Sequence, residues 1–380
     1  ARQKMLAEIG GLPGVRSPLN PQVTGSFERA GYRVENIVFE SQPGFRVTGN
    51  LYLPAGARGR VPAVIGVAGH SNNGKASATY QHAWIGFAKR GIAVFAIDPP
   101  GQGERSEYLD PATGKSRPGP GTSEHTMAGL QTLLTGHAIA RYFVWDGARA
   151  IDYLRTRAEI DPNRIAVAGN SGGGTQAAYL AALEPSLAAI VSSCYMTSWR
   201  DLWTNPGPQD AEQVFPGFLR DELDFGDFML ASNLKPYLMT TAIRDFFPIA
   251  GARATYQETM RVYERAGVSQ AAGYFEFDDT HGWSQPRREA AYRWLDKWFL
   301  NKTSDGAEGE IETEAESRLY ATSTGQLATS LGSKTIQELN AAYARTLKRA
   351  APTRESLEKF LALAPVRDRN GKVTHYVGIE

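Results

Sequence analysis

The chain of 380 residues has one cysteine, almost no net charge and no long apolar stretch. The single cysteine, Cys194, excludes an intrachain disulfide scaffold. A formal net charge of +1 leaves no excess of basic groups for nucleic acid or an anionic membrane. No apolar run approaches the roughly 20 residues needed to cross a bilayer. Because 42% of the residues are hydrophobic, we expect a packed globular protein. The balanced charge and the lack of a long apolar run predict that it has no nucleic-acid or membrane partner.

The central motif of the chain reads GNSGG at residues 169–173. An apolar run at 165–168 precedes it, as expected for a buried strand, and good helix formers at 174–183 follow it. A serine between a strand and a helix, with glycine on both sides, predicts the nucleophile elbow of an α/β-hydrolase. Glycine is expected at both ends because side chains there would meet the crossing backbone. Gly-Ser-Gly clusters also occur in ordinary turns, so the flanking strand and helix carry the prediction of Ser171 as nucleophile.

Apolar runs and helical patterns alternate over most of the chain. A β-hairpin is predicted at 34–53. Further along, short apolar runs predict buried strands and helical spacing predicts the helices between them: strands at 61–68, 92–97, 187–191, 237–243 and 273–277, and helices at 80–90, 138–155, 252–266 and 286–300. This alternation predicts the α/β class, with a doubly wound, mainly parallel sheet and helices on both faces.

Three segments interrupt this alternation within a predicted hydrolase domain of residues 1–300. Residues 1–31 are expected to form an N-terminal arm. Residues 101–137 are rich in Gly, Pro, Ser and Thr and too long for a simple connector, which predicts a functional surface loop. Residues 195–235 predict a cap-like insertion. Most of its aromatic side chains are expected to form its own core, and some to line the substrate pocket: Trp199, Trp203 and Phe215.

The character of the sequence changes after residue 300. Residues 301–317 are polar and acidic and predict a linker. The C-terminal segment, 318–380, is expected to contain two amphipathic helices, at 335–349 and 352–364, and a strand at 372–377. It is either a subdomain or the start of a second domain.

A serine nucleophile needs a base, and the base needs an acid that orients it. In this fold they follow the order serine, acid, histidine, each at the C-terminal end of a strand. His281 is the only histidine after Ser171 in the alternating region, and it follows the predicted strand at 273–277. We therefore predict His281 as the base.

Asp245 is predicted as the acid because it comes directly after the predicted strand at 237–243. A carboxylate there can accept a hydrogen bond from the imidazole Nδ1–H. Asp278 and Asp279 are alternatives because they are close to His281 in sequence. Neighbours in a tight turn usually point apart, which favours Asp245.

The backbone N–H of Gly172 is predicted as one oxyanion-hole donor. The second is expected from the loop after the strand at 61–68, from the N–H of Ser71 or His70. Because His70 precedes the nucleophile, its side chain is expected to be structural or to contact substrate. The GQGE sequence at 101–104 lacks a complete phosphate-binding pattern, and no spacing of His, Cys, Asp and Glu indicates a metal site.

Several of these stretches together resemble bacterial α/β-hydrolases of the acetyl xylan esterase-like group. The similarity covers residues 30 to 300 and lies in these motifs: GHS at 69–71, DPPGQGE at 98–104, WDG at 145–147, GNSGGGTQ at 169–176, GPQDAEQ at 207–213 and DFFP at 245–248. The resemblance implies a carbohydrate esterase that needs no cofactor, is secreted or periplasmic, and acts on a small-molecule or polysaccharide ester. The first residues lack the apolar core of a signal peptide, so a cytoplasmic location stays open, as does the oligomeric state.

Three functions are compatible with this pattern. The leading one is a serine esterase that hydrolyses short-chain (acetyl) esters. A prolyl-oligopeptidase-like peptidase uses the same triad, but the chain has no repeat that would form the large N-terminal propeller such enzymes usually carry. A catalytically inactive binding protein on the same fold is the third, and the presence of all three triad residues argues against it.

Overall fold

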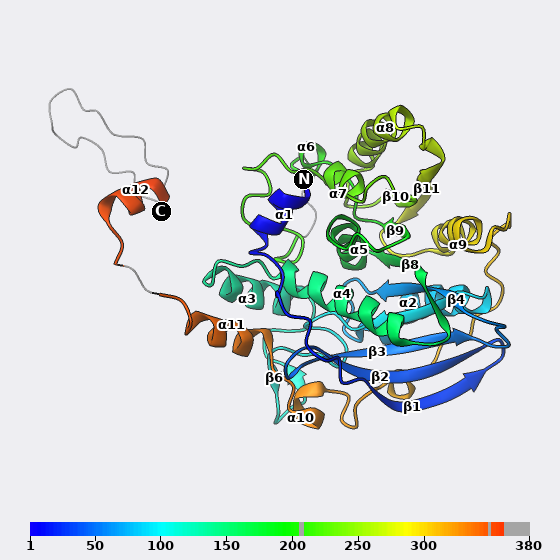
Figure 1. Cartoon of the computed structure of the whole chain (residues 1–380), viewed down its shortest axis with the longest axis horizontal. Coiled ribbons are helices and arrows are strands. Elements are labelled where there is room, and N and C mark those ends of the chain that lie inside the picture. Colours follow the sequence, from blue (N-terminus) through cyan, green and yellow to red (C-terminus); the bar gives the residue numbers. More distant parts are fainter. Residues whose placement is uncertain (205–208, 349–350, 361–380) are drawn as a thin grey trace. The chain divides into compact units, whose positions relative to one another are not determined.

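A nine-stranded mixed sheet organises the chain, as the computed structural model in Figure 1 shows. The structure describes residues 1–204, 209–348 and 351–360. The strand order is β1-β2-β3-β5-β4-β8-β9-β10-β11, antiparallel from β1 to β5 and parallel from β5 to β11. The bounds are β1 Gln22–Arg29, β2 Tyr32–Gln42, β3 Phe45–Pro54, β4 Val61–Val67, β5 Ala93–Ile97, β8 Ile160–Asn170, β9 Ala189–Ser193, β10 Tyr237–Arg244 and β11 Ala272–Thr280. This is the predicted α/β-hydrolase sheet.

Alternate residues of the central strands enter two separate cores, one on each face of the sheet. In β4, Ile65 belongs to one core and Val64 to the other. The first core contains residues of α4, α5 and α8, and the second contains residues of α2 and α9. The bounds of these helices are α4 Ala140–Thr156, α5 Gly172–Leu183, α8 Ile249–Arg265, α2 Ala78–Lys89 and α9 Gln285–Leu300. Apolar residues on both faces of a strand explain the continuous apolar runs in the sequence.

The residues predicted to form an N-terminal arm contain regular structure. They form a short helix, α1 (Arg2–Glu8), and the edge strand β1, which pairs with β2 in antiparallel register. No residue of β1 is fully buried. A strand at the edge of a sheet that faces solvent carries little apolar signal, which explains why the sequence did not reveal it.

The predicted surface loop at 101–137 also contains regular structure. It includes α3 (Thr122–Leu133) and a two-stranded hairpin of β6 (Leu109–Asp110) and β7 (Lys115–Ser116). Met127, Leu130 and Leu133 of α3 are exposed. This helix does not bury a regular apolar stripe, which explains why no helical pattern was visible.

The insertion after β9 contains two short helices, α6 (Trp199–Leu202) and α7 (Phe225–Ala231). Its aromatic rings contact one another and the tyrosines beneath them. Phe218 stacks on Phe215 with 4.5 Å between ring centroids, and Trp199 meets Phe218 edge-on at 4.9 Å. Most of the insertion's aromatics therefore form its own core, as predicted.

The segment after residue 300 differs from the predicted linker. The first compact unit of the chain extends from Ala1 to Ala341. Within it, Leu319 and Ile336 are fully buried, and short helices are formed: η3 Glu316–Arg318, α10 Leu327–Leu331 and α11 Ile336–Ala344, the last of which continues beyond Ala341. The polar composition of 301–317 reflects an extended segment that follows the surface of the hydrolase domain.

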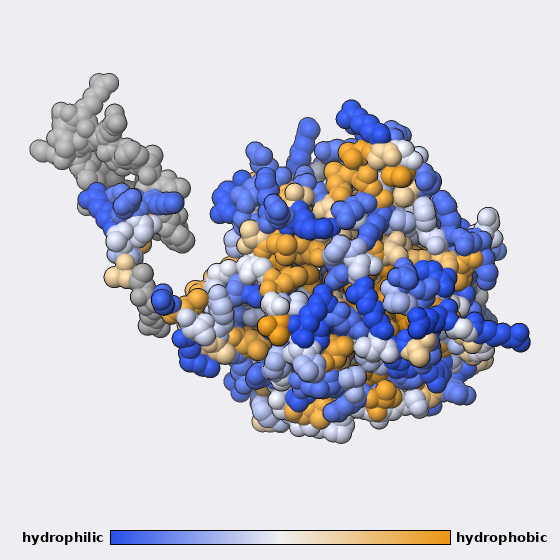
Figure 2. Space-filling model, viewed as in Figure 1, coloured by the Kyte–Doolittle hydropathy of each residue, from blue (hydrophilic) through white to orange (hydrophobic). Residues whose placement is uncertain are grey.

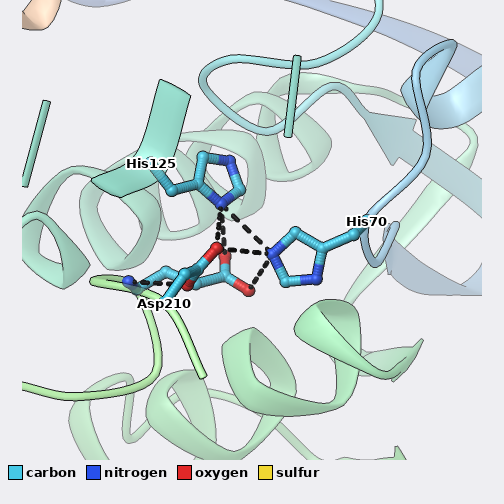
Figure 3. A group of neighbouring side chains, drawn as sticks. His70, His125 and Asp210 are labelled. Carbon is cyan, nitrogen blue, oxygen red and sulfur yellow. Dashed lines mark hydrogen bonds and ion pairs between the residues drawn. The ribbon is translucent and has the colours of Figure 1, made fainter. Parts of the chain in front are cut away.

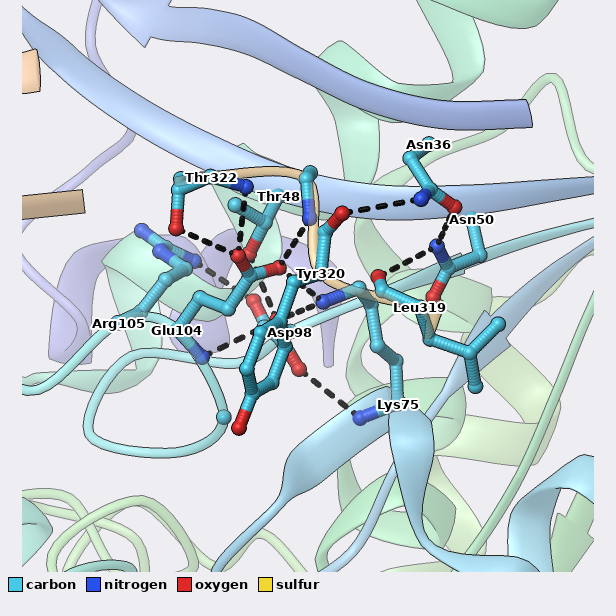
Figure 4. Close-up of polar contacts among 12 residues, drawn as sticks. Asn36, Thr48, Asn50, Lys75, Asp98, Glu104, Arg105, Leu319, Tyr320 and Thr322 are labelled. Carbon is cyan, nitrogen blue, oxygen red and sulfur yellow. Dashed lines mark hydrogen bonds and ion pairs between the residues drawn. The ribbon is translucent and has the colours of Figure 1, made fainter. Parts of the chain in front are cut away.

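Figure 4 shows why this segment is fixed. Glu104 is buried, and its carboxylate accepts hydrogen bonds from the backbone N–H of Ala321 at 2.9 Å and of Thr322 at 2.8 Å. The same carboxylate lies 2.6 Å from Nζ of the buried Lys75, which also pairs with Asp98 at 2.6 Å. Side-chain amides of the sheet bind the carbonyl groups just before these residues. Buried polar groups of the sheet thus depend on the segment for their partners.

The second compact unit comprises residues 342–380, and among its described residues lies α12 (Arg354–Phe360). The predicted strand at 372–377 falls outside the described residues. None of the helices in the described part of the chain is long and apolar enough to cross a membrane.

Candidate active site

The turn between β8 and α5 presents Ser171 at the C-terminal end of the parallel strands. Ser171 has a φ of 61° and a ψ of −126°, a strained conformation for a residue with a side chain. A Cβ atom on Gly169 or Gly173 would overlap with the backbone carbonyl of Val67. The two glycines are therefore required by the close approach of β4, as the sequence predicted.

His281 and Asp245 meet Ser171 from two neighbouring loops. His281 follows β11, and its Nε2 lies 2.8 Å from Oγ of Ser171. Asp245 follows β10, and its Oδ1 lies 2.8 Å from Nδ1 of His281. Oδ1 of Asp245 also accepts the backbone N–H of Phe247 at 3.1 Å, which fixes the carboxylate. The three predicted catalytic side chains thus form one hydrogen-bonded chain.

The two alternative carboxylates have other partners. Asp279 binds the guanidinium of Arg287, with 3.1 Å between Oδ2 and Nη2, and that arginine is fully buried. Asp278 is exposed and pairs with Arg244 at 2.9 Å. Neither is the carboxylate that contacts the imidazole.

Cys194 lies close to the triad but is suited to remain a thiol. It is buried, and its Sγ lies 3.6 Å from the carbonyl oxygen of Gly282. Burial, together with the nearby carboxylate of Asp245, raises the pKa of Cys194 to about 12. Since the thiolate is the reactive form, the thiol of Cys194 is a weak nucleophile at neutral pH.

The loop after β4 approaches Ser171 closely. A Cβ on Gly69 would lie 2.9 Å from Cβ of Ser171. The side-chain amide of buried Gln102 donates to the carbonyl oxygens of Gly69 at 2.8 Å and Ser71 at 3.0 Å. These bonds fix the loop whose N–H groups were predicted as oxyanion donors. Gln102 belongs to the GQGE stretch, which the sequence did not assign to any role.

His70 leads into a group of side chains that the sequence did not bring together, drawn in Figure 3. Its Nε2 lies 2.8 Å from Oδ2 of Asp210, 3.2 Å from Nδ1 of His125 and 3.2 Å from Oε1 of Glu212. Nδ1 of His125 lies 2.9 Å from the same Oδ2. A Cβ on Gly172 would lie 3.0 Å from Cε1 of His70 and would overlap with Glu212. This cluster therefore borders the predicted oxyanion hole.

The charges within the cluster alter the protonation of its members. Burial disfavours the charged form of His70, but Glu212 and Asp210 outweigh this effect and raise the pKa of His70 to about 10. Burial would raise the pKa of Asp210, but hydrogen bonds from His125 and His70 hold it well below its usual range. His70 is thus a cation at neutral pH in the absence of another bound cation, and is unsuited to act as a general base.

The three aromatic residues predicted to line the substrate pocket occupy different environments. Trp199 and Phe215 lie within the aromatic core of the insertion, and Phe215 is 5% exposed. Trp203 is 67% exposed. Only Trp203 of these three presents most of its ring to solvent.

An apolar groove of about 460 Å³ lies between α3 and the insertion. Ile139, Val214 and Phe215 contribute to its walls, and so does Asp210 of the cluster. The space-filling view in Figure 2 shows apolar side chains gathered around α3. The groove therefore combines apolar walls with a buried carboxylate of the cluster.

Comparisons with known proteins identify a family and a relative that this chain is similar to. The sequence profile of the acetyl xylan esterase family (AXE1) matches residues 20–220. YtaP of Bacillus subtilis (strain 168), provisionally named a hydrolase, is 23% identical over 317 residues, covering 78% of this chain and 98% of YtaP.

Solved structures show the same fold. Methylesterase BT1017 superposes with a TM-score of 0.72 at 20% identity, over 95% of this chain and 74% of its own. A glucuronoyl esterase from Solibacter usitatus superposes with a TM-score of 0.59 at 14% identity, over 78% of this chain and 92% of its own.

Proposed function

This chain belongs to the acetyl xylan esterase family, and on that premise we propose that it is a serine esterase that removes acetyl groups from carbohydrates. The family makes it a carboxylic ester hydrolase of the carbohydrate esterase type. The observation that carries the proposal of a serine mechanism is the hydrogen-bonded chain from Asp245 through His281 to Ser171, with both distances at 2.8 Å.

The proposed reaction begins with attack of Ser171 Oγ on the ester carbonyl carbon. Nε2 of His281 accepts the serine proton and then transfers it to the departing sugar oxygen, which leaves an acetyl-enzyme. Water attacks the carbonyl carbon of this ester while Nε2 of His281 accepts its proton; the bond from the acyl carbon to Ser171 Oγ then breaks, His281 returns the proton to Oγ, and acetate is released. Asp245 keeps the proton on Nδ1 of His281, so that Nε2 is free to accept, and stabilises the imidazolium.

Negative charge on the carbonyl oxygen needs preorganised donors. We assign this role to the backbone N–H of Gly172 and to that of Ser71 or His70. The bonds from Gln102 to the loop after β4 support this assignment because they hold the loop against the nucleophile.

Hydrolysis of methyl esters of uronic acids is the second candidate. The observation that favours it is the superposition over 95% of this chain with a structure named a methylesterase. The same triad would serve, with methanol as the leaving group and the sugar on the acyl side. The two proposals differ only in which side of the ester carries the sugar.

Pre-steady-state hydrolysis of p-nitrophenyl acetate tests the serine mechanism. A burst of p-nitrophenol equal to the enzyme concentration is expected if an acetyl-enzyme accumulates. Rates should fall from acetyl to butyryl to octanoyl esters, by about 10–200-fold at most for each methylene. Absence of any hydrolysis by the folded protein would favour an inactive binding protein, and a preference for octanoyl esters would indicate a lipase-like enzyme.

A further inference from the structure

Four side chains next to the oxyanion loop converge from three segments of the chain. His70 comes from the loop after β4, His125 from α3, and Asp210 and Glu212 from the insertion (Figure 3). One nitrogen or oxygen atom from each lies within 4.8 Å of all the others. We propose that these four residues form a binding site for a divalent transition-metal cation, with Zn²⁺ as the best match.

The spacing of the donor atoms fits a small tetrahedral site. Bonds of 2.0–2.1 Å to Zn²⁺ place neighbouring ligand atoms about 3.3–3.4 Å apart. Here Nε2 of His70 is 2.8 Å from Oδ2 of Asp210 and 3.2 Å from both Nδ1 of His125 and Oε1 of Glu212, while the other Glu212 oxygen, Oε2, is 3.8 Å from Nδ1 of His125. The side chains therefore need to shift by only a few tenths of an ångström to surround the ion.

Hydrogen bonds to neighbouring backbone groups orient the ring of His125 and the carboxylate of Asp210 as a metal ion would require. Nε2 of His125 lies 2.8 Å from the carbonyl oxygen of Pro100 and must carry a proton to bind it. In the neutral imidazole, Nδ1 then carries a lone pair, and it points at Asp210 and His70. Oδ1 of Asp210 accepts the backbone N–H of Glu212 at 3.0 Å, which leaves Oδ2 for the centre of the cluster. Bound histidine and carboxylate ligands commonly have such partners.

Glu212 supplies an independent observation. It is 4% exposed, and its Oε1 accepts no hydrogen bond within the described part of the chain although it faces His70. A buried carboxylate oxygen without a hydrogen-bond donor is costly, and a bound metal ion would compensate it in place of the proton on His70. Two imidazole nitrogens and two carboxylates favour Zn²⁺ and similar ions over Mg²⁺ or Ca²⁺, which prefer sites made of oxygen.

Four protein ligands would complete a tetrahedral site, so its role would be structural. The ion would link the loop after β4, α3 and the insertion at the edge of the active site. Binding should therefore raise the temperature of unfolding and need not take part in ester hydrolysis. The proposal is independent of the proposed function, because metal binding can be measured without any substrate.

The test is titration of the full chain with Zn²⁺ alone, after dialysis against a chelator and then against chelator-free buffer. Calorimetry is expected to show one Zn²⁺ per chain and much weaker binding of Mg²⁺ and Ca²⁺. Saturating Zn²⁺ should raise the unfolding temperature by several degrees, since it binds the folded state. An absence of stoichiometric Zn²⁺ binding would show that protons alone hold the cluster together, and would overturn the proposal.

Two near-isosteric variants, Asp210→Asn and Glu212→Gln, keep the packing while removing ligand charge. For Asp210→Asn, Zn²⁺ affinity should fall by more than the roughly 10–100-fold that follows loss of an outer contact, and the thermal shift should disappear. His82→Gln is the matched control, because His82 is a histidine of α2 outside the cluster. Equal Zn²⁺ affinity in the wild type and in both carboxylate variants would place the metal elsewhere and contradict the assignment.

Discussion

Nε2 of His281 lies 2.8 Å from Oγ of Ser171, although 110 residues separate them in sequence. Two turns of the backbone bring these side chains together. The strained turn at Ser171 raises its side chain above the sheet, and the chain turns at the end of β11 directly before His281. The contact gives the proposed mechanism its base, and the predictions about catalysis follow from it.

Replacement of the proposed nucleophile is the first prediction. Ser171→Ala should leave the fold intact and reduce ester hydrolysis by several orders of magnitude, because the triad acts as a unit. An organophosphonate should label Ser171, as mass spectrometry of the peptides can show. The matched control is Ser71→Ala, which keeps the backbone N–H proposed for the oxyanion hole and should retain most activity. Labelling of a different serine would refute the assignment.

The second prediction separates the three carboxylates near His281. Asp245→Asn should reduce kcat by about 10⁴, because the imidazole would be held in the wrong tautomer. Asp278→Asn should have little effect, since Asp278 is exposed and paired with Arg244. Asp279→Asn should lower stability by leaving Arg287 without its carboxylate, while kcat per folded molecule changes far less. Larger damage to kcat from Asp279→Asn than from Asp245→Asn would show that the acid is misassigned.

Truncation tests where the hydrolase domain ends. Removal of residues 351–380 should leave a folded, active enzyme. Removal of 301–380 should prevent folding, because buried Glu104 would lose its bonds from Ala321 and Thr322. Hydrogen bonds to charged groups contribute about 1.5–3 kcal/mol each. This outcome is the opposite of that expected for a linker at 301–317. Circular dichroism and esterase assays on both truncations can decide, and a soluble, active 1–300 fragment would restore the boundary at residue 300.

The fourth prediction concerns the pH dependence of stability. Burial raises the pKa of Glu107 to about 8, against opposing contributions from Arg105 and from the N–H of Ile336. Because this pKa is higher in the folded state than in the unfolded chain, the proton on Glu107 stabilises the folded state. This contribution to the free energy of unfolding is complete below about pH 4.5 and is lost as the pH rises through about 8.

Glu107→Gln should remove this loss. The variant should match the wild type near pH 5 and exceed it near pH 9 by up to a few kcal/mol, since each pKa unit corresponds to about 1.4 kcal/mol. Urea unfolding at the two pH values measures the difference. A constant difference between the two proteins across that range would show that Glu107 ionises normally.

The fifth prediction concerns recognition of the sugar. Trp203→Ala should raise KM for acetylated oligosaccharides several-fold and leave p-nitrophenyl acetate nearly unaffected, because the exposed ring is available for stacking on a sugar face. Trp199→Ala provides the contrast. Its ring packs in the core of the insertion, so its loss should lower stability rather than change substrate preference. Equal effects of Trp203→Ala on both substrates would exclude a role in sugar binding.

The proposed catalytic residues could be predicted from the sequence because their places relative to the predicted strands are characteristic of the fold. Ser171, Asp245 and His281 each follow a predicted strand, and parallel strands align their C-terminal ends, so their meeting could be predicted from order alone. The glycines at 169 and 173 could be explained in the same way, because a Cβ at either position would meet the backbone carbonyl at the end of β4.

Other features depend on contacts that leave no local pattern. His125 lies 55 residues from His70 and 85 from Asp210, so their meeting has no characteristic spacing. The signal available was indirect, since Asp210 and Glu212 belong to a stretch that resembles the esterase group. Glu104 similarly reads as part of a surface loop, although its carboxylate holds a segment more than 200 residues away.

Release of acetate and methanol, measured side by side from acetylated xylan and from a methyl-esterified uronic acid polysaccharide, tests the proposed function most directly. The wild type is expected to release acetate, and Ser171→Ala is expected to release neither product. Methanol release by the wild type without acetate would keep the triad but contradict the proposed substrate class. Acetate release by Ser171→Ala at the wild-type rate would contradict the serine mechanism itself.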